Sequence, residues 1–171
     1  MGVVIRLARA EEILRIREIE DEAGRMFLGS GLIDESLDGS FPLDEMERLI
    51  AKGQVWVACL DDTPVGMAIA SVRDGLVHLE EMDVLPEHGR LGIGGRLLET
   101  VCDWARDMGR KAVTLSTFRD VPWNGPFYRN HGFHDLKPEQ WLPWMLPLRE
   151  NEKEHGLAVE ERVFMRRELD G

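Results

Sequence analysis

The chain has 171 residues, of which 43% are hydrophobic, and a formal net charge of -11. This length suits one domain with a single apolar core, and we expect residues 1–171 to form it. The charge argues against a protein whose main partner is nucleic acid or an anionic membrane, because phosphate binding needs an excess of Lys and Arg. A cationic partner is compatible with it, although an acidic surface also serves solubility alone.

The two cysteines, Cys59 and Cys102, are too few for a disulfide scaffold and lack metal-ligand spacing, so we expect two core residues and no metal site. No stretch reads as a leader peptide, and none approaches the roughly 20 apolar residues that cross a bilayer. The cytoplasm is therefore the expected compartment.

The first half of the chain predicts a meander of strands preceded by amphipathic helices. Glycines interrupt residues 24–42, which predicts a mobile loop or broken helix that could cover a site. Asp74 and Gly75 form a strong hairpin signal. The predicted elements are a strand at 3–7, helices at 10–22 and 43–52, and strands at 54–60, 65–73 and 76–84.

The second half predicts a right-handed crossover. The strand at 111–117 follows the strand at 76–84 after an intervening helix, so the two should be parallel. Prolines and tryptophans make residues 137–158 an ordered but irregular excursion. The predicted elements are a helix at 94–108, a strand at 111–117, a short helix capped by Asn124 and closed by Gly132, a strand from Phe133 and a strand at 161–167.

Residues 79–98 read as a strand, a glycine-rich turn and a helix start, a context that suits a bound diphosphate. Glycines let the backbone approach an anion, while the N–H groups and dipole of the helix attract it. Arg90 and Arg96 could add positive charge on either side. The glycines of this turn are Gly89, Gly92, Gly94 and Gly95.

Other phosphate-binding loops fit these residues less well. A P-loop needs Lys and then Ser or Thr after its final glycine, whereas Gly94 is followed by Gly95 and Arg96. A dinucleotide fingerprint would place a third glycine at Leu97. ATP and NAD are therefore disfavoured as ligands. Residues 79–98, considered without the rest of the chain, are also compatible with a turn that only connects a strand to a helix and binds nothing.

Two stretches resemble the motifs of GNAT acetyltransferases. Residues 81–94 are similar to the strand and Gln/Arg-x-x-Gly-x-Gly/Ala loop that hold CoA, and residues 124–133 are similar to the second motif, Asn followed by Phe-Tyr and Gly-Phe. The resemblance runs from residue 3 to about residue 133. It implies a single α/β (α+β) domain of GNAT type, with a mixed, mostly antiparallel twisted sheet, a splayed parallel strand pair and helices on both faces.

The resemblance also implies acetyl-CoA as cosubstrate, with its pantetheine along the strand and its pyrophosphate on the loop. Gly89 stands where the family usually has Gln or Arg, so affinity should depend more on Arg90. The expected cofactor-binding residues are Met82, Asp83, Val84, Gly89, Arg90, Leu91, Gly92, Ile93, Gly94, Gly95, Asn124 and Phe127.

Tyr128, the only tyrosine, matches the family's general acid, which would protonate the departing sulfur. A helix tyrosine that only packs is the alternative. For the base, Glu80 is the first choice and His78 the reserve, while Glu81 would bind the substrate ammonium. Strand alternation should place Glu80 with His78, Met82 and Val84 on one face and Glu81 with Asp83 on the other.

The expected function is acetyl transfer to an amine by direct attack in a ternary complex, with a small cationic amine as acceptor. The strand at 111–117 lacks an acidic residue that some protein N-terminal acetyltransferases of the family carry there. This absence argues against a protein or peptide as the acceptor, without excluding it. A non-catalytic acyl-CoA-binding or sensing module is the other alternative, favoured by Gly89 and opposed by Tyr128. The expected partner is a small-molecule amine, with no nucleic acid or membrane, and a homodimer stays open.

Overall fold

One mixed sheet organises residues 2–170, the part of the chain that the computed structural model describes. The strand order is β1-β2-β3-β4-β5-β7-β6, and every neighbouring pair is antiparallel except β4 and β5. The predicted fold class is confirmed. The strands are β1 (Val4–Leu7), β2 (Val55–Leu60), β3 (Thr63–Arg73), β4 (Leu76–Val84), β5 (Ala112–Phe118), β6 (His134–Asp135) and β7 (Arg162–Glu168).

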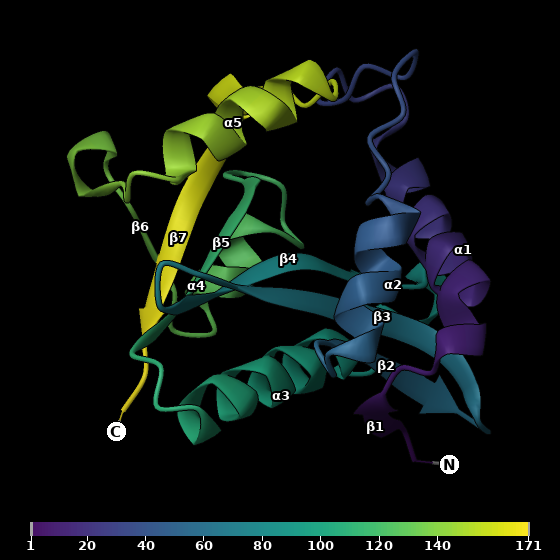
Figure 1. Cartoon of the computed structure of the whole chain (residues 1–171). Helices are drawn as coiled ribbons and strands as arrows, with labels where there is room; N and C mark the ends of the chain where they lie inside the picture. The colour runs from purple at the N-terminus through teal and green to yellow at the C-terminus, as the bar shows by residue number, and fades with distance from the viewer. Residues whose placement is uncertain (1, 171) are drawn as a thin grey trace.

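Helices cover both faces of this sheet. Helix α3 lies on one face, and α1, α2 and α5 lie on the other (Figure 1). Within residues 2–170 no helix is long and apolar enough to cross a membrane. The helices are α1 (Ile13–Gly24), α2 (Leu43–Ala51), α3 (Ile93–Asp107), α4 (Gly125–Arg129) and α5 (Met145–Glu154).

The hairpin between β3 and β4 forms where the sequence predicts it. Asp74 and Gly75 both have positive φ, of 51° and 81°, as a two-residue hairpin turn of the favoured twist requires. Each of these long strands contributes buried residues to the main core, which α1, α2 and α3 complete. The turn therefore fixes the register of the strand that carries the candidate site.

A β-bulge at Glu80 then changes the alternation of β4. Glu81 pairs with Ile69, but the next residue of β3, Ala70, pairs with Leu79, so Glu80 has no opposite partner. With one extra residue, side chains beyond the bulge change faces relative to those before it.

The predicted faces of β4 are wrong for this reason. Glu80 and Glu81 both lie on the face of α1 and α2, where Glu81 adjoins Glu20 of α1. Met82 points instead to the face of α3, near Gly94. Nothing local in the sequence marks the extra residue.

Strands β4 and β5 pair over only three positions and then separate. The last parallel pair is Leu79 with Leu115. Beyond it, β4 keeps its pairing with β3 on the other side. The splayed pair that the resemblance implies is present, and it leaves backbone groups of β4 unpaired on the side that faces β5.

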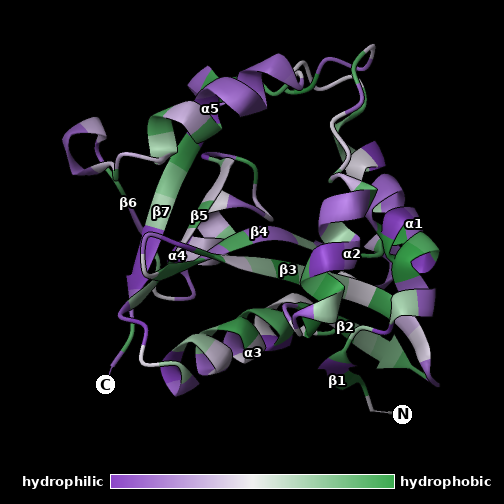
Figure 2. Cartoon of the chain, viewed as in Figure 1, coloured by the Kyte–Doolittle hydropathy of each residue, from purple (hydrophilic) through white to green (hydrophobic). Residues whose placement is uncertain are grey.

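Two local predictions need correction. Residues 137–158 contain the ten-residue helix α5, which tolerates Pro147 because this proline lies in the first turn, where no intrahelical N–H bond is needed. Figure 2 shows the first turn of α5 as hydrophobic and the rest as hydrophilic, in keeping with its packing on β7 at one end only. Asn124 does not cap α4 with its side chain, whose amide donates to the Trp123 carbonyl.

Gly125, the first residue of α4, lies against the backbone of Arg119, and a Cβ there would overlap the Arg119 carbonyl oxygen. We expect Gly125→Ala to lower the free energy of unfolding by about 2 kcal/mol, because α4 must shift to relieve the overlap. Chemical denaturation measures this. Gly24→Ala, where an added Cβ meets no atom within 4 Å, is the control and should not destabilise the fold. Equal stability of the Gly125 variant and the wild type would contradict the close approach.

Candidate active site

A cleft of about 420 Å³ opens where β4 and β5 separate. Its walls are the second half of β4, residues 115–118 of β5 and the end of α1. Residues 24–42, which we call the cover, close one side. The cover is tied to the end of α5 by a hydrogen bond of 2.7 Å from Asp34 N–H to the Gly156 carbonyl. The segment that the sequence predicts as a possible cover therefore lines this cleft.

The glycine-rich turn leads directly into α3. Gly92, with φ of +73°, is the N-cap that precedes the helix, and the first helical bond runs from Arg96 N–H to the Gly92 carbonyl, at 3.2 Å. The N–H groups of Ile93, Gly94 and Gly95 therefore have no intrahelical acceptor. They lie at the positive end of a fifteen-residue helix, which fits the pyrophosphate of CoA.

The predicted loop residues differ in what they can offer. The Ile93 side chain is buried in the core, so only its backbone can reach a ligand, while Arg90 and Leu91 are exposed. Gly89 closes a 3₁₀ turn through its N–H bond to Pro86. Arg96 is turned away, because its guanidinium donates to the Val3 carbonyl at 2.8 Å.

Helix α4 packs against the same turn. A Cβ at Gly94 would lie 3.4 Å from the Phe127 ring, and one at Gly95 would lie 3.1 Å from His131. The two sequence motifs are therefore in contact. The Phe127 ring packs against the turn at Gly94, and Asn124 lines the cleft.

Past Leu79, β4 has no partner on the side that faces β5, and the predicted residues Met82, Asp83 and Val84 belong to this part of the strand, where alternate residues turn their backbone groups to the open side. An extended amide chain such as pantetheine can pair with these groups as an added strand would. Together with the free N–H groups of α3, they fit CoA along one continuous path.

Three carboxylates meet at the bottom of the cleft, from Glu81 and Asp83 of β4 and Glu20 of α1. Burial, and then the charges of Asp83 and Glu20, raise the pKa of Glu81 well above its ordinary value. Burial and the Glu20 charge raise the pKa of Asp83 to about 7. Asp83 Oδ2 is buried and has no hydrogen-bond partner among residues 2–170. The group can therefore hold a proton at neutral pH and is suited to bind a cation.

Glu20 is absent from the sequence-based site, although α1 carried a signal. It occupies the buried face of the helix with Ile16, Ile19 and Ala23, at helical spacing. A carboxylate on an otherwise apolar face needs a partner inside the protein.

Tyr128 lies in the same cleft as the carboxylates, on α4. Its ring is buried and packs edge-on against Phe127 and Phe133, with centroid distances of 5.2 and 5.7 Å. Burial, followed by the charges of Asp83 and Glu81, raises the pKa of its hydroxyl. The phenol therefore keeps its proton at neutral pH.

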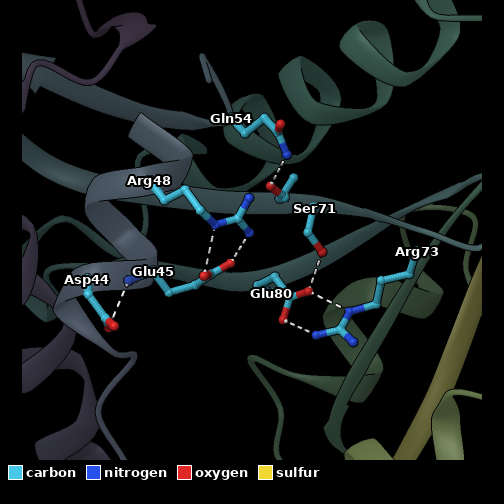
Figure 3. Close-up of polar contacts among 8 residues, drawn as sticks. Asp44, Glu45, Arg48, Gln54, Ser71, Arg73 and Glu80 are labelled. Carbon is cyan, nitrogen blue, oxygen red and sulfur yellow. Dashed lines mark hydrogen bonds and ion pairs between the residues drawn. The ribbon is translucent and has the colours of Figure 1, made fainter. Parts of the chain in front are cut away.

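Glu80 makes a different set of contacts from those expected of a base. It pairs with Arg73 at 2.8 Å and accepts a hydrogen bond from Ser71 (Figure 3). Although burial opposes its ionisation, His78 and Arg73 hold the pKa of Glu80 below its ordinary value. An ion-paired carboxylate of low pKa accepts a proton weakly.

His78 is not exposed in the cleft. Its Nδ1 lies 2.8 Å from the Thr114 hydroxyl, its ring packs edge-on against Trp144, and burial lowers its pKa to about 4. Trp141 and Trp144 join the small core beneath α5, which agrees with a packing role. Within residues 2–170 no group of three or more His, Cys, Asp or Glu residues is arranged to hold a metal ion.

Comparison with known proteins assigns the fold and the class. The model of the acetyltransferase (GNAT) family matches residues 14–133, which span both motifs. The chain belongs to this family and is an acetyl-CoA-dependent N-acetyltransferase.

Individual relatives share the fold at low sequence identity. The uncharacterized N-acetyltransferase YjcF of Bacillus subtilis is 27% identical over 104 residues, 61% of this chain and 72% of the relative. PaiA N-acetyltransferase from Thermoplasma acidophilum, solved with coenzyme A, has a TM-score of 0.76 at 16% identity, covering 98% of this chain and 99% of that one.

N-acetylglutamate synthase from Neisseria gonorrhoeae, solved with coenzyme A and N-acetyl-glutamate, gives a TM-score of 0.76 at 17% identity. All of this chain is covered, but it spans only 36% of the synthase. Both structures establish the fold, and homologues in this family bind CoA.

The raised pKa of Asp83 predicts a pH-dependent stability. A carboxyl that is harder to ionise in the folded state than in the unfolded state costs stability as pH rises from about 4 to about 7. Asp83→Asn should remove this cost and gain about 2 kcal/mol relative to wild type over that range, allowing for partial exposure to water. Chemical denaturation at a series of pH values measures the difference. A constant difference between the two proteins would contradict the raised pKa, and Glu18→Gln, at an exposed position of α1 outside the cleft, is the control.

Proposed function

We propose that this protein acetylates a small cationic amine by direct attack on acetyl-CoA in a ternary complex. The observation that carries the proposal is the meeting of Tyr128 with Glu81 and Asp83 in one cleft. A proton donor and a proton acceptor then lie around one reacting centre. The free N–H groups of the α3 turn would hold the diphosphate away from that centre, because the pantetheine arm of CoA lies between the diphosphate and the thioester.

The acceptor is a cation because of the charge of the cleft. Acidic residues lie both at its bottom and on the cover, at Asp34, Glu35 and Asp38. The Arg162 guanidinium on the opposite wall is paired with Glu152 at 3.2 Å, so it offers little attraction for an anionic substrate. Such a cleft attracts an ammonium group and repels a carboxylate.

The proton of the bound ammonium passes to the Glu81–Asp83 pair, directly or through one water. A base is most effective when its pKa lies near the working pH, which the pKa of about 7 for Asp83 satisfies. This assignment replaces Glu80, whose ion pair with Arg73 holds it in its charged form. Glu80 instead holds the bulge that turns Glu81 into the cleft.

Acetyl-CoA supplies the thioester whose carbonyl carbon the neutral amine attacks. An unpaired N–H of β4 beyond Leu79 stabilises the developing oxyanion. Tyr128 protonates the sulfur as the C–S bond breaks, since its phenol keeps its proton until then. The acylated nitrogen then loses its extra proton, which restores the phenol, and the proton held by the Glu81–Asp83 pair passes to solvent. No covalent bond to the protein is needed.

Thermal melting and turnover test the proposal together. Acetyl-CoA should raise the melting temperature in a concentration-dependent way, whereas NAD and ATP should not. Amines added with acetyl-CoA should release CoA, and Tyr128→Phe should lower kcat about 100-fold while keeping the same thermal shift.

A thermal shift without turnover across a panel of polyamines, aralkylamines and amino sugars would favour the non-catalytic binding module. Turnover that is confined to peptide N-termini would favour the protein acetyltransferase. An unchanged kcat in Tyr128→Phe would show that Tyr128 is not the general acid.

A matched pair of variants separates the two neighbouring glutamates. Glu81→Gln should lower kcat/KM for the amine about 100-fold, because the proton acceptor is lost. Glu80→Gln should lower the melting temperature but change kcat/KM less than about fivefold, because it weakens an ion pair outside the reaction. Steady-state CoA release and thermal melting of both variants measure this, and the reverse order of effects would return the base to Glu80.

A further inference from the structure

Glu20 connects the cover of the cleft to helix α1. Its Oε2 accepts a hydrogen bond of 2.9 Å from the N–H of Phe41, near the end of the cover. Arg17, one turn earlier on α1, donates to the carbonyl oxygen of the same residue. Both backbone groups of Phe41 are therefore held by side chains of α1.

The same carboxylate faces the reaction site. Glu20 Oε1 forms no hydrogen bond with the residues described, although Arg17 Nε lies 3.1 Å away. Glu20 is close enough to Glu81 to share a hydrogen bond when one of the two is protonated, and its charge acts on Asp83. Glu20 is only 8% exposed, so solvent screens these interactions weakly.

Three carboxylates that lie together in one buried cluster repel one another unless a proton or a cation lies among them. The other ionisable groups around them are Arg17 on α1, Glu80 on β4, the neutral phenol of Tyr128 on α4 and, near Tyr128, Arg162 on β7. The cover and the end of α5 add Asp34, Glu35, Asp38 and His155. Arg17 is the nearest cation and is already engaged with the cover. A substrate ammonium would supply the missing positive charge.

We propose that Glu20 is a positioning residue of the acceptor site, which holds the cover at Phe41 and couples its closure to the charge of the Glu81–Asp83 pair. A proton or an ammonium group on the pair relieves the repulsion and lets Glu20 keep its bond to Phe41. The inference rests on the proposed function, in which the pair accepts the substrate proton.

The pH profile of kcat/KM for the amine separates the charge of Glu20 from its hydrogen bond. Glu20→Gln keeps an oxygen that accepts the Phe41 N–H but removes the negative charge. The acidic limb of the profile, where the pair loses its proton, should move about one pH unit lower. Glu20→Ala should move it equally, and Glu18→Gln, at an exposed position of α1 outside the cleft, should move it less than about 0.3 units.

Hydrogen exchange at the Phe41 amide tests whether Glu20 holds the cover at this residue. Exchange should quicken about tenfold in Glu20→Ala and stay near the wild-type rate in Glu20→Gln. An unmoved acidic limb in Glu20→Gln, or unchanged exchange in Glu20→Ala, overturns the proposal.

The two readouts also distinguish this inference from the proposed function. If the wild type acetylates no amine, the proposed function fails, but exchange at Phe41 and an NMR titration of the Glu81 and Asp83 carboxyl carbons still measure the coupling. A lower titration midpoint in Glu20→Gln supports it without turnover, and an unchanged midpoint overturns it.

Discussion

The separation of β4 from β5 after Leu79 and Leu115 is the constraint on which the site depends. A sheet that paired along its full length would leave no free backbone for a ligand and no gap for a side chain from α4. Because pairing stops, β4 offers an unpaired edge, Tyr128 reaches the gap, and the cleft opens between them. The bulge at Glu80 acts at the same point by turning Glu81 toward α1.

Features that depend on neighbouring residues could be predicted from the sequence. The Asp74-Gly75 turn, the run from strand through glycines into α3, and the parallel crossover to β5 all follow from local conformational preference and chain connectivity. The loop residues of the candidate cofactor site were predictable for the same reason, because glycines at a helix start leave its first N–H groups open to an anion.

Features that depend on distant contacts could not be predicted. The bulge is a property of how β3 pairs with β4, and the Arg73–Glu80 ion pair joins side chains of these two strands beside it. Glu20 is more than fifty residues from Glu81 and meets it only in the folded protein. Helix α5 was missed because its prolines suggested an irregular segment, although Pro147 lies where a helix tolerates it. Sequence reasoning therefore reached the glycine turn of α3, which is local, but not the meeting of Glu20 with Glu81, which depends on the fold.

The cleft has walls of separate origin. The α3 turn and the edge of β4 come from one continuous stretch, whereas the cover comes from residues 24–42 and rests on the end of α5 through Asp34 and Gly156. Mutations in the cover can therefore accumulate without disturbing the stretch that would hold the acetyl donor. In evolutionary terms, such a protein can change its acceptor while its donor stays constant. Divergence among its relatives should then concentrate in the cover and in the end of α5 on which it rests.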